Sequence, residues 1–169
     1  MRIFIIIFVS QYFINSSLLG QTTEQFVDFN GTSSYSDGFF ISSNTVAWHY
    51  KEVKKSSSSF AVNAICLNKS DSAYILSDTI QGGCSELQFE FLQEYSTNCS
   101  AEVFVNDFFV GELISENEQD TVKLVTFSNL QFCKSFVLKI KQKNSQSGQI
   151  AIGSISWKSL NCSVLPPFC

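Results

Sequence analysis

Apolar and polar side chains alternate with a period of two through most of the chain after residue 44. In the stretch NTVAWHYKEV, Val46, Trp48 and Tyr50 share one face, and the residues between them fall on the other. This period is typical of β-strands with one buried face, and no comparable helical period is present. The stretches that follow it are residues 44–53, 60–67, 73–80, 86–95, 101–105, 108–113, 121–127, 136–143 and 149–157. The pattern therefore predicts an all-β protein.

The turns between these stretches are also readable. Asn106-Asp107 separates two apolar runs and is a two-residue hairpin signal. Near the end of the chain the apolar phase shifts at Gly153, between Ile152 and Ile155, which predicts a β-bulge. Eight or nine antiparallel strands with one apolar face each must bury those faces against one another. We therefore expect a single-domain β-sandwich of jelly-roll topology.

The N-terminus has the layout of a secretory signal peptide. A basic residue at position 2 precedes the apolar run 3–9, and a polar stretch then ends at Gly20. The run is too short to span a bilayer. We expect cleavage after Gly20, with cleavage near Ser17 and a signal-anchored or lipid-anchored form as alternatives. This divides the chain into a signal peptide over 1–20, a β-sandwich domain over 21–160 and a cysteine-containing tail over 161–169.

Charge and hydropathy narrow the possible partners. The chain has 11 Lys and Arg against 15 Asp and Glu, a net charge of −4. Binding to a nucleic-acid backbone needs clustered basic residues, so an acidic chain of this kind argues against it. No second apolar segment of about 20 residues is present, so we expect no membrane span. The sequence predicts a secreted, extracellular protein.

The cysteines support the same compartment. The six cysteines lie at Cys66, Cys84, Cys99, Cys133, Cys162 and Cys169. An even number behind a signal peptide predicts disulfides, although six cysteines allow 15 pairings. If the strands simply alternate in direction, the pairs are Cys66–Cys99, Cys84–Cys133 and Cys162–Cys169.

N-glycosylation acceptors occur four times in the predicted mature chain, and two of them read Asn-Cys-Ser. Each Asn-Cys-Ser would place a glycan and a disulfide on one exposed turn. In a bacterial protein the acceptors would have no meaning. The candidate glycosylation sites are Asn30, Asn68, Asn98 and Asn161.

Four motifs together resemble a known kind of domain. They are the V-x-W strand at 46–48, the Gly-Gly turn at 82–83, the hairpin VNDFFVGE and the closing ISW at 155–157. Over about residues 26–160 the chain resembles a galactose-binding-like, discoidin-like jelly-roll module, similar to the accessory β-sandwich domain of secreted bacterial nucleases and other exported enzymes. The resemblance implies a non-catalytic domain that binds carbohydrate, in some members with a structural calcium ion.

Catalytic chemistry has little support. His49 is the one histidine, lies on a strand and has no nucleophile motif around it. Glu86, Glu90 and Glu94 lie on one face of one strand, which places Glu86 and Glu90 roughly 13 Å apart, farther than either glycosidase mechanism uses. A carboxylate of an adjacent strand, such as Glu102, would be the closer alternative. We expect the protein not to be an enzyme.

The acidic strand has a basic counterpart. Lys139, Lys141 and Lys143 alternate outward along another strand. We interpret the two stripes as solvated, opposed charged faces.

Ligand contacts are expected from aromatic residues outside the core pattern, because a sugar ring stacks its C–H face on an aromatic ring. We expect Trp48 and Trp157 to be buried. Asp37, Asp71 and the nearby Asp78 offer oxygen to a calcium ion, although a turn-forming role explains them equally well. The candidate ligand-binding residues are Tyr35, Phe39, Phe40, Tyr95 and Phe108, with Phe132 as a further loop aromatic.

These observations predict a secreted, non-catalytic module that recognises an extracellular glycan or glycoprotein. The alternative is a structural or cell-surface protein with protein partners and no sugar site. An exposed apolar patch around Phe39-Phe40 or Phe108-Phe109 would favour the alternative.

Overall fold

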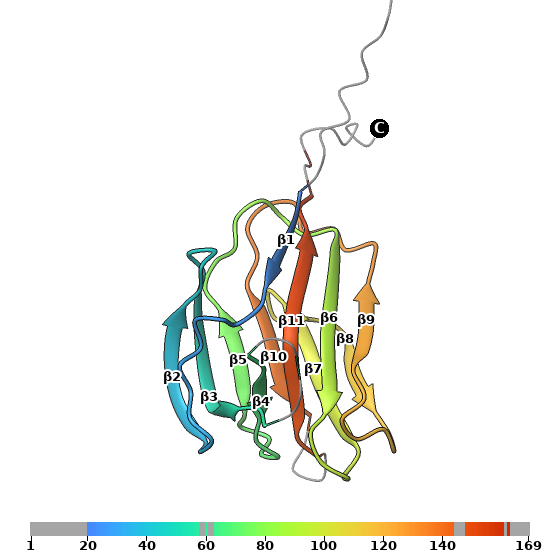
Figure 1. Ribbon diagram of the computed structural model, residues 1–169. Helices are drawn as coiled ribbons and strands as arrows, with labels where there is room; N and C mark the ends of the chain where they lie inside the picture. Colours follow the sequence, from blue (N-terminus) through green and yellow to red (C-terminus); the bar gives the residue numbers. More distant parts are fainter. Residues whose placement is uncertain (1–19, 58–59, 61–62, 144–147, 161, 163–169) are drawn as a thin grey trace, which may run out of the picture.

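The computed structural model describes residues 20–57, 60, 63–143, 148–160 and 162. Within them, backbone hydrogen bonding defines eleven strands, all joined to their neighbours in antiparallel fashion (Figure 1). The strands are β1 (Gln21–Glu24), β2 (Ser36–Ile41), β3 (Ala47–Lys55), β4 (Ile65–Leu67), β5 (Tyr74–Ser77), β6 (Glu86–Gln93), β7 (Cys99–Val105), β8 (Phe108–Ser115), β9 (Lys123–Phe127), β10 (Leu138–Gln142) and β11 (Ile150–Lys158).

The strands form two layers that share β3. One layer has the order β2-β3-β5-β10-β7-β8, and the other has the order β3-β4-β11-β6-β9 with β1 added along β11. In Figure 1, β11, β6 and β9 lie in front of β10, β7 and β8. Strand β3 bends at Glu52, whose backbone has a positive φ of 51°. Its first half therefore pairs with β2 and β5 and its second half with β4.

The core lies between the two layers and consists of the inward-facing residues of the alternating strands. Trp48 on β3 and Trp157 on β11 are 0% and 3% exposed, as expected. Phe26, on the turn after β1, packs edge to face against Trp48 with ring centres 5.7 Å apart. The predicted all-β jelly-roll sandwich is confirmed.

Two local predictions are also confirmed. Asn106 and Asp107 both have positive φ, 50° and 63°, as the tight turn between β7 and β8 requires. The register between β11 and β6 shifts between Ile152 and Ser154, which is the bulge expected at Gly153. A side chain at Gly153 would lie 2.6 Å from the ring of Phe60, so the bulge also makes room for that ring.

The predicted disulfide pairing is wrong. Cys133 is bonded to Cys162, with their Cα atoms 5.3 Å apart, so neither Cys84–Cys133 nor Cys162–Cys169 forms. The backbone of Cys84 does lie beside Cys133, through the hydrogen bond from Cys84 N to Phe132 O, but its thiol points into the core. Strand order is the reason for the error, because the long β9–β10 connection runs back beside the end of β11.

Cys66 and Cys99 are free, buried thiols, which also contradicts the predicted Cys66–Cys99 bond. Cys66 belongs to a small apolar cluster on the outer side of β4, whereas Cys99 belongs to the core between the layers. Cys99 begins β7 and is buried, so the Asn-Cys-Ser at residues 98–100 is not the exposed, disulfide-pinned turn that the sequence predicts.

The candidate glycosylation sites lie in different environments. Asn30 and Asn98 are exposed, and Asn68 is half-buried with its amide donating to Glu52 Oε2. Asn161, Cys169 and the predicted signal peptide up to residue 19 lie outside the described residues. Within the described part of the chain, no helix has the length and apolarity needed to cross a membrane.

Candidate functional site

The outer face of the β2-β3-β5-β10-β7-β8 layer carries an unbroken cross-strand row of side chains. Each member of the row is the register partner of the next, so the row crosses all six strands. Neighbouring strands lie about 4.8 Å apart, so the row is about 24 Å long. From edge to edge it consists of Phe39, His49, Leu76, Lys139, Phe104 and Phe109.

Each end of this row, which we call the outer row, is a pair of aromatic rings. At the β2 edge, Phe39 lies against His49 with ring centres 6.0 Å apart. At the β8 edge, Phe104 and Phe109 meet edge to face at 5.7 Å. A bulge in β8 brings Phe109 opposite Phe104, since the register shifts between Val103 and Phe104. The outer row thus presents two separated aromatic surfaces.

A second row runs beside it, two residues further along the strands. Tyr74 on β5 stands between Lys51 on β3 and Lys141 on β10, each being its register partner. Lys139 of the outer row places its ammonium nitrogen 5.5 Å from the centre of the Tyr74 ring, a cation–π contact. The middle of the face therefore holds a tyrosine surrounded by three lysines.

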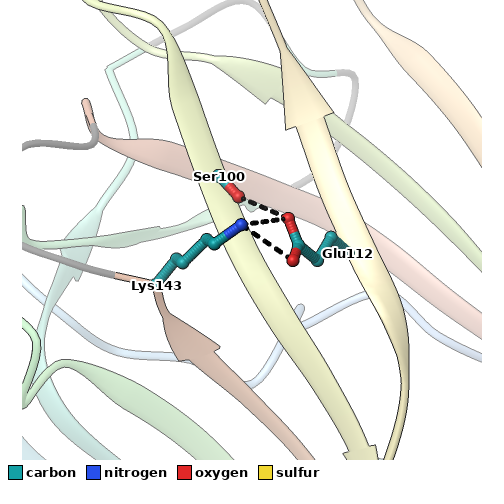
Figure 2. Close-up of polar contacts among 3 residues, drawn as sticks. All are labelled: Ser100, Glu112 and Lys143. Atoms are coloured by element: carbon teal, nitrogen blue, oxygen red, sulfur yellow. Dashed lines mark hydrogen bonds and ion pairs between the residues drawn. The ribbon is translucent and has the colours of Figure 1, made fainter.

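The β7–β8 end of the second row is acidic and internally paired. Glu102 is the register partner of both Lys141 and Glu112. Figure 2 shows that Glu112 accepts hydrogen bonds from Lys143 Nζ, at 2.7 and 2.8 Å, and from Ser100 Oγ at 3.2 Å. These bonds hold the Glu112 carboxylate and neutralise its charge.

A shallow hollow adjoins the β2 end of the outer row. It has a volume of about 520 Å³ and is lined by the β1–β2 connection, β2 and β3. The polar groups on its wall include the Asp28 carboxylate and the side chain of Asn30. Phe39 and Ile41, both more than half exposed, form the side of the hollow next to the row.

The structure separates the predicted ligand-binding residues. Phe39 (65% exposed) lies in the outer row, and Phe108 (69% exposed) lies off it at the tip of the β7–β8 hairpin. Phe40 is only 8% exposed and packs against Phe26 and Phe29, which removes it from the candidate ligand contacts. Its strand neighbour Phe39 points outward because successive strand residues face opposite sides.

Tyr35 and Tyr95 lie on the other layer, around a buried lysine. Lys54, 8% exposed, donates a 2.7 Å hydrogen bond to the Tyr95 hydroxyl and faces both tyrosine rings at 5.3 and 5.1 Å. Burial alone would lower the pKa of Lys54, but the bond to Tyr95 and nearby negative groups such as Glu94 raise it above its usual value. Burial also raises the pKa of the Tyr35 hydroxyl. These tyrosines hold a charge inside the protein and do not form one surface with Phe39.

The acidic side chains between residues 86 and 94 each have a different environment. Glu86 pairs with Lys158 at 2.6 Å, Glu90 accepts from Ser154, and Glu94 is buried. His49 pairs with Asp78 at 3.0 Å on the exposed face. The geometry therefore spreads these groups over both layers and does not gather them into one cleft.

The predicted calcium ligands are not brought together. Asp37 on β2 accepts the backbone N–H of Glu52 at 2.8 Å, and Asp71 lies in the exposed turn between β4 and β5. Among the described residues there is no group of three or more His, Cys, Asp or Glu side chains that fits a metal ion. Two buried carboxylate oxygens, Glu24 Oε2 at the end of β1 and Asp28 Oδ2 in the β1–β2 connection, lack a hydrogen-bond partner within the described part of the protein.

The outer row is not identifiable from the sequence because its members come from six strands that are not consecutive. Of its six residues, the sequence predicts Phe39 as a ligand contact and places His49 and Lys139 only at the surface. For Phe104 and Phe109, the signal in the sequence is alternation, which places them at outward-facing positions of β7 and β8.

Comparison with known proteins identifies structures of similar fold but does not assign the chain to a family. No family profile matches the sequence, and no curated protein matches it. Among solved structures, a carbohydrate-binding module CBM36 in complex with calcium and xylotriose is similar, with a TM-score of 0.56 and 11% identity over 81% of this chain and 99% of that one. A CBM36-1 domain of a multidomain xylanase from the hindgut metagenome of Trinervitermes trinervoides gives a TM-score of 0.57 and 8% identity over 84% and 99% of the two chains.

A GH26-CBM35 β-(1,4)-mannanase from Podospora anserina is also similar, with a TM-score of 0.53 and 13% identity over 88% of this chain and 29% of that one. The fold implied by the sequence resemblance is thus confirmed, and these structures are carbohydrate-binding modules or contain one. They give no support to the link with nucleases.

Proposed function

We propose that the protein is a secreted, non-catalytic module that binds an extracellular glycan along the outer row. The observation that carries the proposal is the register of the row itself. It places two exposed aromatic pairs on one open sheet face, on a fold shared with carbohydrate-binding modules.

The chemistry of the face suits a sugar chain. Phe39 and Phe109 are more than half exposed, and rings held in this way offer flat apolar surfaces to the C–H faces of sugars. Lys139 lies between them, and Lys51, Lys141 and Glu102 lie in the second row beside it; such side chains can donate or accept hydrogen bonds with sugar hydroxyl groups. A chain lying across the strands contacts one aromatic pair at each end, so its affinity depends on both pairs.

Calcium has a place in this proposal at the β1–β2 connection. Calcium takes oxygen ligands, and buried carboxylate oxygens without partners are costly unless something binds them. Two such oxygens are present: Oε2 of Glu24, a residue only 1% exposed, and Oδ2 of Asp28, four residues later. Glu24 Oε1 already accepts the backbone N–H of Phe26 at 2.7 Å, which fixes the carboxylate. A calcium ion held there would fix the turn that lines the hollow beside Phe39.

The calcium proposal is tested by thermal unfolding with calcium and with chelator. We expect calcium to raise the Tm of the native sequence and not that of the Glu24→Gln variant. Equal Tm values with calcium and chelator would rule out this site.

The glycan proposal is tested by binding the secreted, oxidised protein to a broad array of glycans and polysaccharides. We expect saturable binding to a defined sugar, with a loss of at least tenfold in affinity in Phe39→Ala and in Phe109→Ala. Phe108→Ala is the matched control, since Phe108 is equally exposed but lies outside the outer row. A folded protein that binds no glycan would contradict the proposal.

A protein-binding role is the second candidate, and one observation favours it. Phe108 and Phe109 stand at the hairpin tip beside a hollow of about 480 Å³ whose wall includes Leu130 and Phe132. This is the exposed apolar patch expected of a protein-binding surface. Loss of partner binding in Phe108→Ala, with no glycan binding in the native protein, would favour this candidate.

A further inference from the structure

The middle of the outer face is positively charged, although the chain as a whole is negatively charged. The chain as a whole is acidic, with a net charge of −4. Yet Lys51, Lys139 and Lys141 lie together around Tyr74 on three neighbouring strands. Among the residues that the structure describes, acidic side chains adjoin two of these lysines: Glu102 is the register partner of Lys141, and Glu52 interacts electrostatically with Lys51. The centre of the face is therefore locally basic.

These lysines differ from the fourth lysine on the face. Lys143 has both carboxylate oxygens of Glu112 within 2.8 Å. Within the described ranges of the chain, Lys51, Lys139 and Lys141 take part in no ion pair. Although Lys51 interacts electrostatically with the Glu52 carboxylate, no ion pair holds these three ammonium groups in place within the described ranges, so they can turn toward a ligand.

The surroundings of the three lysines strengthen an electrostatic contact. All three are only partly exposed, and their register partners on β5 are Tyr74 and Leu76. Charges near apolar side chains interact more strongly than charges in bulk water, since the effective dielectric constant is lower. The contact of Lys139 with the Tyr74 ring holds one ammonium group above the centre of the cluster.

We propose that this cluster binds the anionic group of an acidic sugar. The inference rests on the proposed glycan function and narrows it to acidic polysaccharides. A carboxylate and a sulfate ester share the required chemistry, because both present negative oxygens to ammonium donors. Neutral residues of the same chain would occupy the aromatic pairs at the two ends of the outer row.

The test measures binding of the full, oxidised protein to charged polysaccharides and to uncharged counterparts in buffer of about 0.15 M salt. Polygalacturonate carries carboxylates, and dextran sulfate and carrageenan carry sulfate esters. Methyl-esterified pectin, dextran and agarose are the uncharged polymers. The variants are Lys51→Gln/Lys141→Gln and the control Lys134→Gln, which changes an exposed lysine in the β9–β10 connection.

We expect at least one charged polymer to bind at least tenfold more tightly than its uncharged counterpart. The charged polymers that bind identify the carboxylate or the sulfate as the ligand group. The double variant should lose at least tenfold in affinity and the control less than twofold, and salt of about 1 M should remove the difference. Equal binding of charged and uncharged polymers, or an equal loss in Lys134→Gln, would overturn the inference.

The variants of the aromatic rings test the glycan function separately from the lysine variants. If a neutral glycan binds, and Phe39→Ala loses it while the lysine variants keep it, the glycan function stands and the acidic-sugar inference fails. If the lysine variants alone lose binding, the acidic-sugar site stands and the aromatic pairs are not part of it. Binding to no polymer would overturn both.

Discussion

Phe39 on β2 and His49 on β3 are register partners whose rings lie 6.0 Å apart on the outer face, with their planes 33° apart. On its other side, His49 Nε2 lies 3.0 Å from Asp78 Oδ1 at the end of β5. Three segments of the chain thus hold one exposed aromatic pair in place. A ring with such contacts loses less rotational freedom when a ligand binds, which favours affinity.

Phe39 and Phe40 are neighbours with opposite roles, and substitution should separate them. Phe39→Ala should weaken glycan binding about tenfold, or about 1.4 kcal/mol, and change the free energy of unfolding by less than about 0.5 kcal/mol. Phe40→Ala removes a ring that packs against Phe26 and Phe29, so it should destabilise the protein by about 3–5 kcal/mol. Urea denaturation and a binding titration measure the two effects. The assignment fails if Phe39→Ala destabilises the fold as much as Phe40→Ala.

The cysteines should show one bridge and three protected thiols among those that the structure describes. Peptide mapping without reduction should find Cys133 joined to Cys162. A thiol reagent should modify Cys66, Cys84 and Cys99 only after unfolding, because all three are buried. Removing the bridge with Cys133→Ser/Cys162→Ser should cost about 2–4 kcal/mol of stability. A peptide that joins Cys84 to Cys133 would contradict this arrangement.

The buried thiols predict a loss of stability in alkali. Burial raises the pKa of Cys66 and of Cys84 to about 12 and that of Cys99 to about 11, from an ordinary value of 9.0. Between about pH 9 and 11 the unfolded chain therefore binds fewer protons than the folded one, and the free energy of unfolding falls as pH rises. Each thiol contributes about 1.4 kcal/mol per pH unit within its range.

Urea denaturation at about pH 8, 9, 10 and 11 measures this loss. Cys99→Ala is a suitable comparison, because it removes one of the three titrating groups and should make the decline less steep. A free energy of unfolding that stays constant across this range would show that these thiols are not buried as described.

The buried lysine of the other layer donates a hydrogen bond to one phenol, that of Tyr95. Tyr95→Phe removes the oxygen that accepts the hydrogen bond of Lys54 Nζ and keeps the ring beside it. Because Lys54 is almost fully buried, we expect a loss of about 1–2 kcal/mol in the free energy of unfolding. Tyr74→Phe, which removes a hydroxyl from the opposite layer, serves as the control and should cost less. Equal losses in the two variants would mean that the Tyr95 hydroxyl does not hold Lys54.

The strands and local turns are predictable because they depend on neighbouring residues. Alternation along β3 identifies the buried face of Trp48, and the phase shift at Gly153 identifies the bulge in β11. Asn106 and Asp107 identify their turn because few residue types accept positive φ. Each of these features is encoded within about ten residues of sequence.

The order of strands is not predictable in the same way, and the errors follow from it. β10 lies between β5 and β7, far from both in the sequence, and this order brings Lys141 beside Tyr74 and Glu102. The disulfide hypothesis assumes simple alternation of strand direction, so it misses the contact of Cys133 with Cys162. Long-range pairing depends on packing across the whole sandwich, which a local pattern does not carry.

The most direct test of the central claim is to titrate the isotope-labelled, oxidised protein with a glycan selected from the array and to follow each backbone amide by NMR. The outer-row account predicts shift changes concentrated on the outer-facing residues of β2, β3, β5, β10, β7 and β8, with the largest near Phe39, Tyr74 and Phe109. Changes confined to β4, β11, β6 and β9, or to the hairpin tip around Phe108, would place the ligand elsewhere and contradict the account.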